Sequence, residues 1–152
     1  MDPKKTILGL LLGMLLAIVP WAARAERSVE FGDYVIHYNA FNSSILQPDV
    51  AQRHGIVRSR YRALVNVAAL KKVPGTTGEP VSASVTGTAT NLSGQQRQIG
   101  FQEVREGTAV YYLGDLRIDN DQEVVDFDLQ VEPEGKAPGT TIRFRQTFFT
   151  EE

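Results

Sequence analysis

The chain has 152 residues, with 16 basic and 18 acidic side chains and no cysteine. Without a polybasic run, this charge balance argues against nucleic-acid binding and against an electrostatic membrane anchor. The absence of cysteine excludes disulfides, thiol nucleophiles, thiolate metal sites and lipoprotein acylation.

Residues 1–25 have the organisation of a secretory signal peptide. Two lysines precede an apolar run of about 13 residues, and Ala23-Arg24-Ala25 then offers small side chains for cleavage. The run is too short to span a bilayer securely. We therefore expect cleavage near Ala25, export to the periplasm and no stable membrane anchor. The remaining residues 26–152 have the length of one domain.

The first predicted elements are a strand, a short helix and a long strand. In residues 34–41 apolar and polar side chains alternate, which places Tyr34 and Ile36 on one face and His37 on the other. Pro48 at a first helical position and Gly55 at a stop position predict one short helix over residues 48–54. Residues 58–70 alternate again and form the longest predicted strand.

Five further segments follow, separated by turn residues. Residues 81–90 carry small side chains that favour close approach of a second sheet, and residues 96–105 are polar enough for an edge strand. Residues 109–118, 123–132 and 140–150 complete the set. About seven short strands predict an all-β, immunoglobulin-like antiparallel β-sandwich, with the helix between the first two strands. We expect this single domain to occupy residues 26–152.

Three strings of the sequence resemble a known family. They are YNAFNSS at 38–44, GIVRS at 55–59 leading to Asn66-Val67, and VTGTATNLSG at 85–94. With these strings the chain resembles the Domain of Unknown Function 4426 family of small exported proteobacterial proteins, over essentially all of the mature chain. The resemblance implies a periplasmic, immunoglobulin-like β-sandwich without an assigned activity, and it supplies no catalytic residues.

The sequence contains no recognisable catalytic constellation. Its two histidines, His37 and His54, have no partner motif, and neither a nucleophile-elbow serine nor a phosphate-binding glycine loop is present. We interpret His37 as a rim histidine and His54 as a residue that closes the short helix. A cleft that brought either histidine within hydrogen-bond reach of a carboxylate would favour an enzyme. Without it, we expect a non-enzymatic protein that needs no cofactor.

Acidic residues offer calcium binding as an alternative function. Asp119, Asp121 and Glu123 alternate as calcium ligands can, although Asp-Asn-Asp is also ordinary turn chemistry and the glycine of an EF-hand loop is missing. Asp126 and Asp128 lie about 7 Å apart along one strand face, where we expect solvated carboxylates.

The candidate interaction surface consists of basic, amide and aromatic residues. Arg60 and Arg62 share one face with Asn66, where they could bind an anion or pair with acidic residues on a neighbouring strand. In the pairs Tyr111-Tyr112 and Phe148-Phe149, one ring of each must face away from the main core, where it forms either a partner site or a minor core beneath the helix or a long loop. We take Arg60, Arg62, Asn66, Tyr112 and Phe149 as the candidate surface.

The sequence thus favours a non-enzymatic binding or protein-interaction module whose partner is another envelope protein. The alternative is an envelope carrier of a small anionic ligand or of calcium. The identity of the partner and the oligomeric state are left open.

Overall fold

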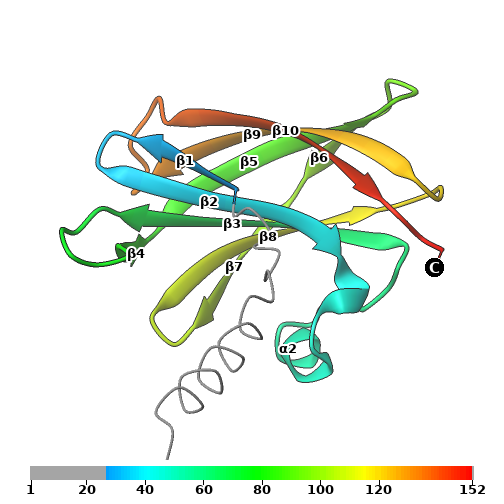
Figure 1. The fold of residues 1–152 in the computed structure, drawn as a ribbon, viewed down its shortest axis with the longest axis horizontal. Coiled ribbons are helices and arrows are strands. Elements are labelled where there is room, and N and C mark those ends of the chain that lie inside the picture. Colours follow the sequence, from blue (N-terminus) through cyan, green and yellow to red (C-terminus); the bar gives the residue numbers. More distant parts are fainter. Residues whose placement is uncertain (1–26, 152) are drawn as a thin grey trace, which may run out of the picture.

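The computed structural model describes residues 27–151, which form two stacked antiparallel sheets and one short α-helix (Figure 1). The predicted signal peptide, residues 1–25, lies outside the described residues. Within residues 27–151, no helix is both long enough and apolar enough to cross a membrane.

The first sheet has six strands. Its main order is β1-β2-β3-β8-β7, and β4 pairs with one end of β3. The bounds are β1 Arg27–Phe31, β2 Tyr34–Asn42, β3 Arg62–Lys71, β4 Glu79–Val81, β7 Phe101–Glu106 and β8 Ala109–Arg117.

The second sheet has four strands in the order β10-β9-β5-β6. The bounds are β5 Ala83–Asn91, β6 Gln96–Ile99, β9 Glu123–Pro133 and β10 Thr140–Phe148. A single 3-10 turn, η1 (Ser43–Ile45), and the helix α2 (Pro48–Arg53) connect β2 to β3. The helix predicted over residues 48–54 is therefore present.

The core lies between the two sheets and is built by period-two alternation. In β9, Val125, Phe127, Leu129 and Val131 are all at most 2% exposed, whereas the residues between them point outward. Phe127 stacks on Phe144 with ring centroids 4.8 Å apart. Burial of these side chains is the main source of stability, since residues 27–151 contain no disulfide.

Glycine has a steric role in this core at Gly87. A Cβ atom built there would lie 2.5 Å from Leu129 Cδ2 on the paired strand β9. The small side chains of residues 81–90 therefore make room for a neighbour in the same sheet.

Residues 27–151 contain ten strands where the sequence predicted about seven. The strand β1 precedes the first predicted strand and pairs with it across a two-residue turn. The chain changes sheet twice inside predicted strands: β4 pairs with β3 but β5 pairs with β9, and Gly100 separates β6 of the second sheet from β7 of the first. The helix consequently lies between the second and third strands.

Candidate functional site

Large apolar side chains are exposed in an unusual grouping. Among the described residues, five of them are more than half exposed, and four belong to three chain segments that meet at one end of the sandwich. These are Ile45 in η1, Val57 and Tyr61 in the loop before β3, and Phe149 after β10, at 56%, 62%, 57% and 56% exposure. Figure 1 shows the ends of β2 and β10 and the start of β3 at this end. We call these four residues the end patch.

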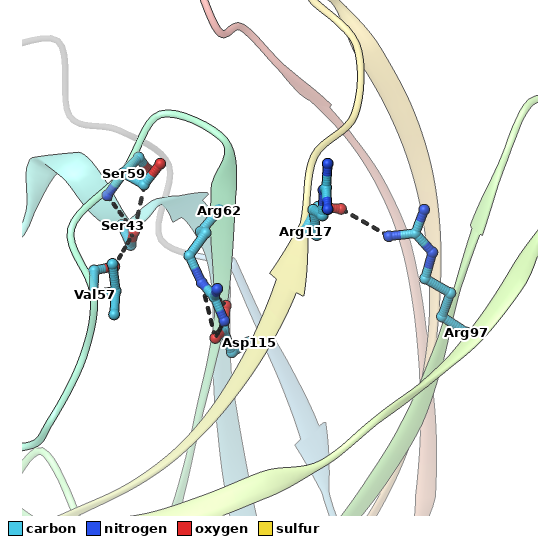
Figure 2. Close-up of polar contacts among 7 residues, drawn as sticks. All are labelled: Ser43, Val57, Ser59, Arg62, Arg97, Asp115 and Arg117. Atoms are coloured by element: carbon cyan, nitrogen blue, oxygen red, sulfur yellow. Dashed lines mark hydrogen bonds and ion pairs between the residues drawn. The ribbon is translucent and has the colours of Figure 1, made fainter.

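Two side chains hold the end patch together. Ser43 is fully buried, and its Oγ lies 2.7 Å from the Val57 carbonyl oxygen and accepts a 2.9 Å hydrogen bond from the Ser59 amide (Figure 2). Asn42 donates from Nδ2 to the carbonyl oxygens of Arg60 at 2.7 Å and Phe149 at 3.2 Å. The loop before β3 is thus fixed to η1 and to the end of β10, so the patch residues are presented on an ordered backbone.

A groove with a volume of about 1150 Å³ extends from the end patch along the outer face of the six-stranded sheet. Its described lining includes Ile45 and Phe149 of the patch, and apolar side chains from β2, β3 and β8 such as Val35, Leu70 and Tyr111. It also contains arginine, histidine and amide side chains, but no aspartate or glutamate among the described residues. A volume of this size suits a ligand or a segment of polypeptide.

The outer face of the four-stranded sheet is different. It carries threonines of β5 and two ion pairs between β9 and β10, Asp126 with Arg145 at 2.7 Å and Asp128 with Arg143 at 2.8 Å. The hydrogen bond from Arg145 lowers the pKa of Asp126. This is the normal solvent face of an antiparallel sheet, so the apolar groove distinguishes the other sheet as the candidate binding face.

The structure separates the candidate residues named from the sequence. Asn66 and Phe149 line the groove. Arg62 forms an ion pair with Asp115 of the neighbouring strand β8, which raises the pKa of Arg62 (Figure 2). Of the two roles expected for Arg62, anion binding and cross-strand pairing, the structure shows the pairing. Arg60 is exposed before β3, and its carbonyl oxygen accepts from Asn42.

Tyr112 does not belong to this surface. The residue is buried in the core with 6% exposure, and its hydroxyl accepts from the Ala83 amide at 2.8 Å and donates to Glu103 at 3.0 Å. Burial is the main cause of its raised pKa. The outward ring of the pair is Tyr111, which lines the groove. Farther along β8, polar residues such as Asp115 lie on the same strand face as Tyr111. This alternation could have shown from the sequence that Tyr111, and not Tyr112, faces outward.

The carboxylates of the acidic turn, Asp119, Asp121 and Glu123, form hydrogen bonds and an ion pair within the protein. Glu123 accepts hydrogen bonds from the amides of Asp119 and Asn120, and Asp121 accepts from the amides of Thr150 and Glu151. Asp119 pairs with Arg97, whose other terminal nitrogen donates to the Arg117 carbonyl oxygen (Figure 2). These bonds lower the pKa values of Asp119 and Asp121.

Within residues 27–151, no group of three or more metal-ligating side chains is arranged to hold an ion. The turn carboxylates act as structural caps.

One histidine does lie beside a carboxylate. His54 Nε2 is 2.5 Å from Glu106 Oε1, and Arg53 approaches the same oxygen at 3.5 Å. These contacts, which lower the pKa of Glu106, tie the end of α2 to β7. Neither His54 nor Glu106 lines the groove, whereas His37 does. The contact joins α2 to β7 outside the described groove lining, and His54 also closes the helix with its backbone amide.

Comparison with known proteins gives a consistent result. The model of the family described as Domain of unknown function (DUF4426) matches residues 28–151. The crystal structure of a DUF4426 family protein (PA0388) from Pseudomonas aeruginosa PAO1 is 38% identical, covers 84% of this chain and 97% of that chain, and superimposes with a TM-score of 0.71. No curated protein matches the chain.

Proposed function

This chain belongs to the DUF4426 family, whose function is unknown, and from its surface we propose that it is a non-enzymatic, exported polypeptide-binding module of the periplasm. The single observation that carries the proposal is the end patch, continuous with an apolar groove on one face of the sandwich. Contiguous exposed apolar surface marks interaction sites, because its exposure to water is otherwise unfavourable.

Export is part of the proposal. It rests on residues 1–25, where two lysines, an apolar run and an Ala23-Arg24-Ala25 sequence follow one another as in a cleavable signal peptide. Processing near Ala25 leaves a chain that starts close to β1, so the sandwich is retained whole.

We also propose that the sandwich is of the immunoglobulin-like class. The order β2-β3-β8-β7 in one sheet and β10-β9-β5-β6 in the other corresponds to the ABED and GFCC′ orders of that class, with β1 and β4 as additions. In this assignment the end patch lies on the connection that follows strand A (β2) and just after strand G (β10), at the end opposite the B–C and F–G loops through which variable domains bind, so the patch itself, rather than the fold class, supports this location.

A small anionic ligand is the second candidate. One observation favours it: the groove lining contains Arg27 and His37 but no acidic residue among the described ones. The calcium alternative has less support, since the carboxylates of the acidic turn already accept hydrogen bonds from the chain.

The test is site-specific photocrosslinking in cells that express the full chain. A photoreactive residue replaces Tyr61 or Phe149 of the end patch, and Thr141, exposed on the four-stranded sheet, is the control position. We expect the same protein partner to be captured from both patch positions and not from Thr141.

Two substitutions complete the test. Tyr61→Ser combined with Phe149→Ser should abolish capture from a third patch position, Val57, without lowering the melting temperature, because these rings are already exposed. Leu92→Ser removes an even more exposed apolar side chain from the β5–β6 turn and should leave capture unchanged. Equal capture from all positions, or none from a folded and abundant protein, would refute the proposal.

A further inference from the structure

The strand β2 is longer than its neighbour β1. β1 pairs with Tyr34 to Tyr38 only, whereas β3 follows the other side of β2 as far as Asn42. Within residues 27–151, the last four residues of β2 therefore have no strand on the β1 side. Four residues of extended chain offer an edge of about 13 Å.

The backbone groups that face this edge can be assigned. β1 and β2 are joined by the two-residue turn Gly32-Asp33, in which Gly32 has a φ of 56°. The residues that close such a turn, Phe31 and Tyr34, form two backbone hydrogen bonds with each other. The N–H and C=O groups of every second residue of β2, counted from Tyr34, therefore point to the β1 side. Ala40 and Asn42 therefore direct their N–H and C=O groups toward the open side.

The groove passes around this same edge. Its lining includes residues from both faces of β2, with Phe41 on the outer face and Ala40 on the core face. Across the edge lies the end of β10, where Phe148 and Phe149 line the groove. A strand placed beside Ala40 and Asn42 would thus contact apolar side chains on both of its faces.

Among the described residues of the groove lining, Arg27 is the one lysine or arginine, and it lies at one end of this space. Arg27 begins β1 opposite Tyr38, and its guanidinium lies 5.4 Å from the centre of the Phe144 ring. Its Nη1 atom is buried and makes no hydrogen bond within residues 27–151. A buried guanidinium nitrogen without an acceptor is unfavourable, and no acidic residue of the described lining can provide one.

From these observations we propose that a partner protein binds by adding an extended, apolar segment as a strand to the open edge of β2 at Ala40 and Asn42, with an acidic side chain of that segment meeting Arg27. Strand addition draws affinity from backbone hydrogen bonds and specificity from alternate side chains. This inference rests on the proposed function, since it gives the mode by which the binding module holds its partner, and on the proposed cleavage near Ala25, since the edge is open with respect to residues 27–151.

The test starts from a phage-displayed library of random seven-residue peptides, selected on protein purified from cells that express the full chain. Enriched peptides should have apolar residues at alternate positions and an aspartate or glutamate near one end. Each is synthesised with backbone N-methyl groups on one or the other set of alternate residues. N-methylation of the peptide residues whose N–H groups point toward β2 should weaken binding about tenfold or more. N-methylation of the other residues should leave the affinity unchanged.

Two measurements locate the peptide on the protein. Arg27→Gln should weaken an acidic peptide about tenfold, whereas the matched control Arg143→Gln, on the outer face of the other sheet, should have no effect. Thermal unfolding of both variants checks that they are folded. Amide exchange followed by NMR should slow at Ala40 and Asn42 when the peptide is bound.

The outcomes separate this inference from the proposed function. Peptides that bind with no sensitivity to N-methylation, or that protect other amides, overturn strand addition. Failure to enrich any peptide also overturns it, and capture of a partner at Tyr61 and Phe149 would then show that the binding function survives without it. A purified protein that dimerises with protection of Ala40 and Asn42 would assign the edge to a second copy instead. If both peptide selection and crosslinking fail, the proposed function fails with the inference.

Discussion

Replacement of Ser43 by alanine should destabilise the protein far more than the loss of one hydroxyl group suggests. Ser43 is fully buried, and its Oγ accepts from the Ser59 amide at 2.9 Å while it can donate to the Val57 carbonyl oxygen at 2.7 Å. Each hydrogen bond contributes about 1 kcal/mol net, and partners left buried and unpaired cost more. We expect Ser43→Ala to lower the free energy of unfolding by about 2 kcal/mol.

Urea and thermal unfolding measure this change. For a domain of this size, 1 kcal/mol corresponds to about 3 to 5 °C, so the melting temperature should fall by about 6 to 10 °C. Amide exchange at Ser59 should also become faster, because Ser43 Oγ accepts that amide's hydrogen bond. Ser28→Ala is the control, since Ser28 is exposed on β1. A loss no larger than that of Ser28→Ala, with unchanged exchange at Ser59, would refute the assignment of Ser43 as the residue that fixes the loop.

Three further predictions concern the core and the acidic turn. Tyr112→Phe leaves the Ala83 amide without its 2.8 Å acceptor and should cost about 1 to 3 kcal/mol in urea unfolding; an unchanged midpoint would place the hydroxyl outside the core network. Gly114→Ala would push a Cβ atom into Ile99 and should also cost about 1 to 3 kcal/mol, and wild-type stability would contradict the packing described. The pKa of Asp121 is lowered in the folded state by two backbone N–H groups after β10, so its stabilising effect is present above the unfolded pKa of about 3.9 and is lost as pH falls through the folded value. Stability should therefore fall more in wild type than in Asp121→Asn below about pH 4, and parallel pH profiles would contradict this sign.

Much of the candidate site could not be predicted from the sequence because it depends on contacts between distant segments. Phe149 and Asn66 were identified from local patterns and do line the groove. The other three residues of the end patch were not identified, because Asn42 joins segments 18 and 107 residues away from it through backbone carbonyl oxygens. Any residue can supply a carbonyl oxygen, so no residue type along the chain signals this contact.

The sequence by itself determined the antiparallel β-class, the inward faces of strands such as β9, and the short helix at Pro48. These follow from local alternation and from the fixed φ of proline, which act within a few residues. Tertiary structure alone decided that Gly100 divides one predicted strand between two sheets and that, within residues 27–151, β1 leaves the end of β2 open. A strand's sequence shows which face is apolar, but the choice of neighbouring strand is made by pairing across the whole chain. That choice also puts the Tyr111 ring in the groove and the Tyr112 ring in the core.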